Sequence, residues 1–343
     1  MSEHWTTLIT TADYAEGVLC LATSLQIVAS RAPLLCYVPS PTIEAAILAG
    51  AGADHPSNLI VRLIPESCYD EMFQQDITRD GGDFIDAARR FLFLLGEPFV
   101  FLDADMIVTR NIDELLDHLR GEGVGAAGAA GAAGAVGEGH GGDVGGVGGV
   151  SGTPVGADGG RILAVPNFRN KKRGYGGEEG NFNAGLMVVP RPSRGDYEKM
   201  MGMLRGGYAD TEEKLLNEVF RDRWSLLPVG YNCQKRAFRL APAVWNQVLA
   251  SPSGVRVLHF VGGKPWQCRE ELTRLDWEFR SAPHALDCYA PLFRLWHRVR
   301  RREIGAAELS AAVPAAGTVE GEVEGGVARQ AQTAQEPQHT LVP

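Results

Sequence analysis

The sequence lacks several patterns that would place it in familiar classes of protein. None of its six cysteines forms a C-x-x-C pair, so a structural zinc site is not expected and reduced cysteines can serve as small apolar residues. No run of about 18 apolar residues occurs, and therefore no membrane span is expected. Polar residues interrupt the first apolar segment, which argues against a secretory signal. These absences favour a reducing, cytoplasmic location.

Positive charge is also scarce. The formal net charge is −9 at pH 7, which argues against a nucleic-acid-binding protein because such a protein needs a basic face. Part of the negative charge lies in residues 121–160, a segment with no Lys or Arg. The rest of the chain is mildly acidic, a balance that favours solubility.

Two segments are too poor in apolar side chains to contribute to a core. Residues 121–160 hold 18 of the 42 glycines, and residues 304–343 are rich in Ala, Gln, Glu and Pro with no aromatic residue. Such composition is typical of low-complexity, disordered chain. We therefore expect one domain over residues 1–303, interrupted by an insert at 121–160 and followed by a disordered tail at 304–343.

Short β-rich runs alternate with helical patterns elsewhere, which predicts an α/β fold with a mostly parallel central sheet flanked by helices. Strands are predicted at residues 5–10, 34–38, 59–64, 98–102, 162–165, 186–189 and 255–260. Helices are predicted at residues 14–28, 43–51, 86–95, 111–119, 197–204, 212–220 and 287–302.

The strongest chemical signal lies in residues 100–108, where an apolar run leads directly into Asp103 and Asp105. Ligands of open α/β sheets bind at the carboxyl ends of the strands. Two carboxylates held there form half of a site for a hard cation, which could bridge a diphosphate and neutralise its charge as it leaves. The alternative is an aspartate pair that only caps the following helix or lines a turn.

The same residues allow a second enzyme class. An apolar strand followed by D-x-D is also the first motif of haloacid-dehalogenase-type phosphatases, in which the first aspartate is the nucleophile. That class places the motif near the start of its domain and needs a later acidic pair. Here the motif follows a long N-terminal segment and no adjacent aspartate pair comes after it, so the phosphatase remains the less favoured hypothesis.

A second signal lies in residues 257–266, where a predicted strand delivers His259, followed by two glycines and Lys264. Imidazole is a good manganese ligand beside two carboxylates. Gly262 and its neighbour allow close backbone approach to a phosphate, and the lysine supplies a point charge for it. A lone histidine at a strand end is more often a structural one, but the upstream D-x-D favours a metal ligand here.

Two weaker signals lie between these. Residues 181–188 open an apolar strand with a polar residue and a glycine, and residues 211–217 place acidic residues at the start of a helix. A capping role for Thr211 with glutamate in the first turn accounts for the latter equally well. Neither signal identifies a function when taken alone.

Taken in order, these motifs resemble those of the glycogenin-like glycosyltransferases of family 8. The matching segments read TTADYAEG at residues 10–17, FLDAD at 101–105, FNAG at 182–185, EEKLLN at 212–217 and HFVGGKPW at 259–266. The resemblance therefore spans roughly residues 5–270. It implies a fold of the GT-A type and a retaining transfer of a hexosyl group from a UDP-sugar donor with manganese (Mn2+).

The resemblance also implies a role for each matching position. The implied metal ligands are Asp103, Asp105 and His259. The implied contacts to the nucleotide and its diphosphate are Ile9, Thr11, Tyr14, Ala104, Gly262 and Lys264. The residues implied to face the sugar or to act in catalysis are Asn183, Gly185, Glu212 and, again, Lys264. Arg89 or Arg90 lies near the position of the family's donor-binding lysine.

The sequence departs from the family pattern at two places. Glu212 and Glu213 stand where the family has Asp-Gln, so the second position carries a charge in place of an amide. The segment after Asn232 lacks the acceptor tyrosine of self-glucosylating glycogenins. The acceptor is therefore expected to be a separate carbohydrate, polyol or protein, and a nucleotide-sugar-binding protein without catalytic activity remains an alternative.

Overall fold

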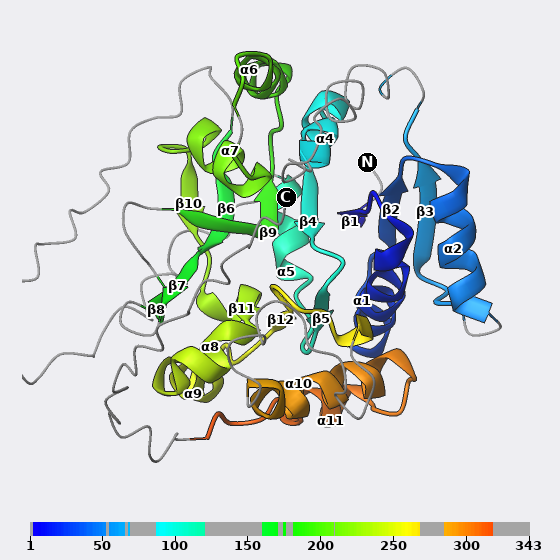
Figure 1. Cartoon of the computed structure of the whole chain (residues 1–343), viewed down its shortest axis with the longest axis vertical. Coiled ribbons are helices and arrows are strands. Elements are labelled where there is room, and N and C mark those ends of the chain that lie inside the picture. The colour runs from blue at the N-terminus through cyan, green and yellow to red at the C-terminus, as the bar shows by residue number, and fades with distance from the viewer. Residues whose placement is uncertain are drawn as a thin grey trace, which may run out of the picture.

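The computed structural model describes residues 3–52, 55–65, 68, 87–120, 160–170, 174–175, 181–208, 210–267 and 285–317. Most of the expected insert therefore lies outside the described residues. A seven-stranded sheet runs through the middle of the molecule, with helices against both of its faces and a smaller three-stranded sheet below it in the view of Figure 1.

One edge of the large sheet is built by the N-terminal segment. Strand β1 (Trp5–Leu8) pairs in parallel with β2 (Leu34–Val38), which pairs in parallel with β3 (Leu59–Leu63). Helices α1 (Ala15–Ile27) and α2 (Pro41–Ala51) form the connections. Helix α2 starts two residues before the predicted start at residue 43, because the Ser40 hydroxyl accepts from the Ile43 N–H and a proline occupies the first turn.

The other strands of the large sheet are β4 (Phe99–Leu102), β6 (Ile162–Pro166), β9 (Phe182–Val189) and β10 (Trp224–Leu226). The strand order is β10-β6-β9-β4-β1-β2-β3. Strand β9 is antiparallel to both β4 and β6, and every other pairing is parallel. Six strands therefore share one direction, which confirms the mostly parallel sheet predicted from the sequence.

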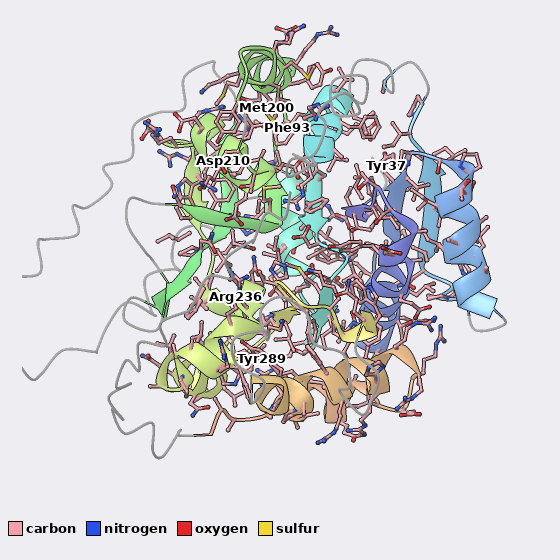
Figure 2. The ribbon with its side chains drawn as sticks, in the orientation of Figure 1. Tyr37, Phe93, Met200, Asp210, Arg236 and Tyr289 are labelled. Carbon is pink, nitrogen blue, oxygen red and sulfur yellow. The ribbon has the colours of Figure 1, made fainter. Side chains whose placement is uncertain are left out.

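Both faces of the large sheet are buried. Alternate residues of β2 enter opposite clusters, with Cys36 packing toward α1 and α2, and Tyr37 toward α4 (Arg90–Leu95). Helices α6 (Arg194–Arg205) and α7 (Glu212–Val219) cover the second face with α4. Phe93 of α4 and Met200 of α6 belong to that cluster (Figure 2). Burial on both sides explains why the strands read as unbroken apolar runs.

The smaller sheet was not predicted as such. It contains β5 (Met106–Val108), β12 (Val257–His259) and β11 (Cys233–Gln234), with β12 in the centre. Strand β5 begins one residue after Asp105 and runs antiparallel to β12, so that Met106 lies opposite His259. This pairing brings together two chain segments about 150 residues apart.

The remaining described elements lie outside the large sheet and the helices named above. They are η1 (Ala12–Tyr14), η3 (Ala87–Arg89), α5 (Glu114–Asp117), η4 (His118–Arg120), β7 (Phe168–Asn170), β8 (Gly174–Tyr175), η6 (Val229–Asn232), α8 (Lys235–Leu240), α9 (Pro242–Ala250), η7 (Pro265–Gln267), α10 (Ala285–Arg300) and α11 (Ala306–Ala311). Within the described ranges no helix is both long and apolar enough to cross a membrane.

The first residues of the segment expected as a tail pack against the rest of the domain. Leu309 of α11 is fully buried, and Val313 also enters the main core. The Trp245 indole N–H donates to the Pro314 carbonyl at 2.8 Å, and the Asn246 side chain bonds both backbone groups of Ala316. These hydrogen bonds hold residues 314–316 against α9. Residues 318–343 lie outside the described residues.

Gly230 of η6 fits where no larger residue would. A Cβ there would lie 2.0 Å from the Gly254 carbonyl oxygen, which is backbone and cannot move aside alone. We expect Gly230→Ala to lower the free energy of unfolding by about 1–3 kcal/mol through overpacking. Gly202 of α6 is a matched control, since its added Cβ would meet nothing within 4 Å.

Gly202→Ala should raise stability by about 0.5–1 kcal/mol, because alanine is the better helix former. Urea unfolding of the two variants measures both effects. Equal effects of the two substitutions would contradict the close approach at Gly230.

Candidate active site

The two aspartates lie in a tight loop between β4 and β5. The backbone N–H of Asp103 donates to the Gly185 carbonyl at 2.8 Å, and the carbonyl of Asp105 accepts from the Phe260 N–H at 2.9 Å. The loop is therefore fixed to β9 on one side and to the end of β12 on the other. Both carboxylates emerge at the carboxyl end of β4, the edge at which α/β sheets bind ligands.

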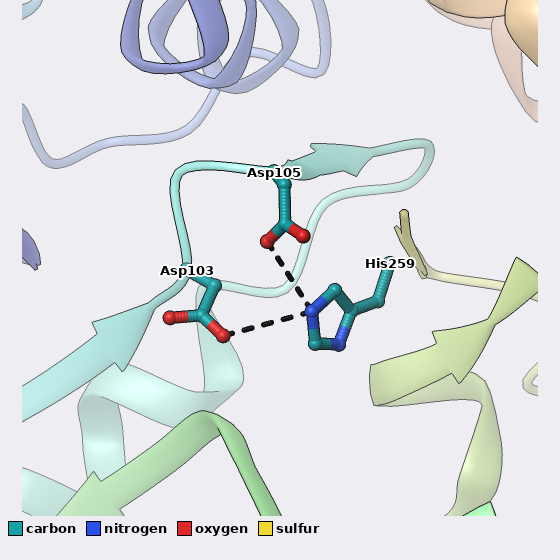
Figure 3. Close-up of side chains that lie close together, drawn as sticks. All are labelled: Asp103, Asp105 and His259. Atoms are coloured by element: carbon teal, nitrogen blue, oxygen red, sulfur yellow. Dashed lines mark ion pairs between the residues drawn. The ribbon is translucent and has the colours of Figure 1, made fainter. Parts of the chain in front are cut away.

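His259 completes a cluster with these aspartates (Figure 3). Its Nε2 lies 3.2 Å from Asp105 Oδ1 and 3.6 Å from Asp103 Oδ2. The three potential ligand atoms lie within 4.8 Å of one another, and His259 and Asp105 are buried. Two carboxylates and an imidazole suit a divalent cation such as manganese. The donor set therefore fits the metal implied by the sequence.

Gly185 makes room for this cluster. A Cβ at this position would lie 2.5 Å from His259 Cε1 and 2.8 Å from Asp103 Oδ2. The glycine that the sequence assigns to the sugar thus lies directly against two candidate metal ligands. Any larger residue would displace the imidazole or the carboxylate.

Lys264 reaches the cluster from the loop after β12. Gly262 has φ 81° in that loop, a conformation that favours glycine. The Lys264 ammonium forms an ion pair with Asp105 Oδ2. Burial raises the pKa of Asp105, but Lys264 and His259 outweigh it and hold that pKa well below its usual range. Burial lowers the pKa of Lys264, and the Asp105 charge outweighs it, so the lysine stays charged.

The N-terminal motif meets the same loop. The Tyr14 ring contacts the Trp266 ring edge-on at 5.5 Å, and the Lys264 ammonium lies 5.6 Å from the Tyr14 ring centre. A Cβ on Gly17 would lie 2.5 Å from the Ala104 carbonyl oxygen and 2.8 Å from the Trp266 ring. The TTADYAEG, DAD and KPW segments therefore converge in space. Of the other two implied nucleotide contacts, Ile9 is buried and Thr11 is exposed.

Arg89 joins the site. Its Nη2 donates to Asp103 Oδ1 at 2.8 Å, and its Nε lies 3.2 Å from Glu212 Oε2. Its backbone N–H donates to Glu212 Oε1 at 2.8 Å. Arg90 is buried, with 1% of its surface exposed. Both oxygens of Glu212 therefore contact Arg89, so this glutamate positions the arginine.

Asn183 contacts residues that the sequence analysis left without a role. Its Nδ2 donates to Glu213 Oε2 at 2.7 Å, while its Oδ1 accepts from the Asn232 amide at 2.7 Å. The other oxygen of Glu213 accepts from Asn167. Burial raises the pKa of Glu213. The one sequence signal for this network was the glutamate in place of the family's glutamine, and it did not reveal the partners.

The raised pKa of Glu213 predicts how the stability of the protein depends on pH. The folded protein holds this proton more tightly than the unfolded chain, whose carboxyl has its ordinary pKa of 4.5. Stability must then fall as the pH rises from 4.5 through the raised value, because the buried group ionises there. We expect Glu213→Gln to remove this loss, so the stability of the variant relative to the wild type grows over that window and is constant above it.

Urea unfolding of both proteins from about pH 4 to about pH 8 measures the difference. If the stability of Glu213→Gln relative to the wild type decreased as the pH rises, the raised pKa of Glu213 would be contradicted.

Comparison with known proteins identifies the family. The model of the family described as glycosyl transferase family 8 matches residues 96–269, half of the chain. That range holds both aspartates, Asn183, His259 and Lys264. No match is found among curated proteins.

Several solved structures are similar to this chain. The galactosyltransferase LgtC, solved with donor and acceptor sugar analogues, is 16% identical, with 81% of this chain and 99% of that chain covered at a TM-score of 0.48. GlyE, a glycosyltransferase of Streptococcus pneumoniae, is 14% identical over 90% of this chain and 63% of its own, at 0.49. Mouse xyloside xylosyltransferase 1 is 13% identical over 76% and 98%, at 0.45.

Proposed function

Because the chain belongs to glycosyl transferase family 8, we propose that it transfers a hexosyl group from a UDP-sugar to an acceptor with retention of configuration. Its α/β sheet is the GT-A type fold expected for this family. The observation that carries the proposal is the convergence of Asp103, Asp105 and His259 with Lys264 at one edge of that sheet. The acceptor is proposed to be a carbohydrate, a polyol or a protein.

Asp103, Asp105 and His259 would hold the Mn2+ ion of this reaction. When bound, the ion supplies Lewis-acid stabilisation of the charge on the diphosphate. Burial raises the pKa of Asp103, and repulsion by the nearby Asp105 carboxylate raises it further. A cation between them removes that repulsion, which supports a metal-binding role over a purely structural one.

Lys264 would bind the leaving diphosphate. Its ammonium lies beside Asp105 with only 13% of the side chain exposed, so its charge acts where water screens it weakly. Gly262, with its positive φ, lies two residues before Lys264 in the same loop. A fixed charge aimed at the position where charge develops lowers the barrier without reorganisation.

The donor nucleotide and the sugar would lie on opposite sides of the aspartate loop. Tyr14 lies with Lys264 and Trp266 on one side, which suits the nucleotide. Asn183 and Arg89 lie on the side of β9 and α7, which suits the sugar. Glu212 contributes by holding Arg89, since both of its oxygens contact that residue.

One of the two alternative functions suggested by the sequence remains a candidate. The family assignment removes the phosphatase hypothesis. A protein that binds a nucleotide-sugar without transferring it is retained as the second candidate, because the Glu213 charge is buried beside Asn183. A cytoplasmic location is also proposed, on the grounds that Cys20, Cys36 and Cys233 are buried free thiols.

Release of UDP from a panel of UDP-sugars, with and without candidate acceptors, tests the function. We expect manganese-dependent release by the wild type, and its loss in Asp105→Asn, which removes a charged ligand. Donor binding without release under every condition would favour the non-catalytic alternative. Full activity of the variant, or of the wild type in EDTA, would contradict the metal site.

Added manganese should restore turnover in the His259→Ala variant but not in the Lys264→Ala variant. In His259→Ala two carboxylates remain, so excess manganese should restore part of the turnover. In Lys264→Ala no amount of metal replaces the charge, and turnover should stay about a hundredfold or more below wild type. Steady-state kinetics across a manganese titration separates the two. Near-normal turnover in Lys264→Ala would disprove its role at the diphosphate.

A further inference from the structure

A continuous chain of hydrogen bonds leads away from the candidate metal ligand His259. Its Nδ1 lies 2.8 Å from Asn232 Oδ1. The Asn232 Nδ2 donates to Asn183 Oδ1 at 2.7 Å, and the Asn183 Nδ2 donates to Glu213 Oε2 at 2.7 Å. His259, Asn232 and Asn183 are all buried, with Asn232 at 0% exposure. Buried amides in such a chain have no water to replace a lost partner.

The Gly185 N–H and the Glu213 carboxylate determine which atoms donate and which accept in this series of hydrogen bonds. The Gly185 backbone N–H, which can only donate, points at one atom of the Asn183 side chain at 3.1 Å, so that atom is the oxygen. The Asn183 amide nitrogen then faces Glu213, whose carboxylate accepts. The atom of Asn232 that faces Asn183 Oδ1 must therefore be its nitrogen, and its oxygen must face His259.

The orientation of the Asn232 amide determines which nitrogen of His259 is available to bind a metal ion. Because Asn232 Oδ1 accepts, His259 Nδ1 carries a proton, so in the neutral imidazole Nε2 is the nitrogen that offers its lone pair to a metal ion. Nε2 is the atom that faces Asp103 and Asp105. The Asn232 amide therefore favours the tautomer needed for metal ligation. Among the described residues, this amide forms hydrogen bonds to His259 and Asn183 and none to the two aspartates.

We propose that Asn232 is a positioning residue that holds His259 in its ligating tautomer and ties that ring to Asn183. Metal binding and the orientation of the sugar-side amide are thereby coupled through one side chain. The inference rests on the proposed function, which supplies the metal and the sugar. Asn232 is not a catalytic residue, since it is fully buried behind the residues it orients.

The backbone around Asn232 is braced for such a role. Gly230 packs against the Gly254 carbonyl. The Tyr231 hydroxyl donates to Glu114 Oε1, and the Arg256 guanidinium lies 5.2 Å from the centre of the Tyr231 ring. Strand β11 follows at once and pairs with β12, placing Gln234 opposite His259. The Asn232 amide therefore lies at the end of η6, immediately before the strand that pairs with the strand of His259.

Two substitutions of Asn232 separate its two contacts. Asn232→Ala removes the acceptor for His259 and the donor for Asn183. Asn232→Asp keeps the acceptor but presents an oxygen to Asn183 Oδ1, and Asn183 cannot turn because Gly185 and Glu213 hold both ends of its amide. The first variant should lose metal affinity, and the second should keep it while losing turnover.

The measurement is the Kd for Mn2+ of the full-length, nucleotide-free protein, obtained from the electron paramagnetic resonance signal of the free ion. We expect the Kd of Asn232→Ala to rise about 10–100-fold, the usual cost of removing an outer partner of a metal-bound histidine. The Kd of Asn232→Asp should equal or fall below that of the wild type. Its kcat with an accepted UDP-sugar should drop by about tenfold or more.

Asn246→Ala is the matched control. Asn246 of α9 also forms two amide hydrogen bonds, both to the backbone of Ala316 and neither to a residue of the metal cluster. It should lower the melting temperature and leave the Kd for Mn2+ unchanged. A merely structural Asn232 would behave in the same way.

Each result decides the inference. A Kd for Asn232→Ala within about twofold of wild type, or a loss of affinity in Asn232→Asp, overturns it. If Asn232→Ala does not fold, Asn232→Asp decides alone: retained affinity with lowered kcat supports the coupling, and lost affinity overturns it. A wild type that binds no Mn2+ refutes the proposed metal itself, a failure visible before any variant is measured.

Discussion

The burial of two carboxylates side by side is the constraint on which the site depends. Asp103 and Asp105 repel each other, and burial raises the cost of charging both. Arg89 forms an ion pair with Asp103, and Lys264 forms one with Asp105, which offsets this cost. These cations come from segments before and long after the aspartate loop, so the site exists only when the tertiary structure is complete. A bound cation would add to the same balance, which is the reason for regarding the cluster as a metal site.

The reversed direction of β9 explains where the motifs lie. In a wholly parallel sheet, the residues that open a strand and those that follow one lie at opposite edges. Because β9 is antiparallel to β4, its first residues lie where β4 ends. Asn183 and Gly185 therefore meet the aspartate loop, although the sequence places them at the start of a strand. One inverted strand converts two separate motifs into a single site.

The sequence predicted the long elements and the motif residues, and it failed where structure depends on distant partners. Strand β2 was predicted with its observed bounds, since an apolar run is ended by Pro39 and its neighbours. Strands β5 and β11 have three residues and two, too few for a period, and exist only because β12 pairs with both. Asn232 was missed for the same reason: a buried amide leaves no pattern in the sequence, and its role is defined by His259 and Asn183.

The glutamate at position 213 brings its neighbours into one consistent arrangement. Both of its oxygens accept, from Asn183 and from Asn167, and Asn167 in turn accepts from Gln234 at 3.1 Å. A glutamine here would turn its NH₂ group toward one of those donors. Asn183 cannot adapt, because the Gly185 N–H fixes its oxygen. Asn167 and Gln234 would therefore have to turn together, which leaves the connection through Asn183 to His259 intact. The connection through Asn183 to His259 therefore does not depend on whether position 213 holds a glutamate or the family's glutamine.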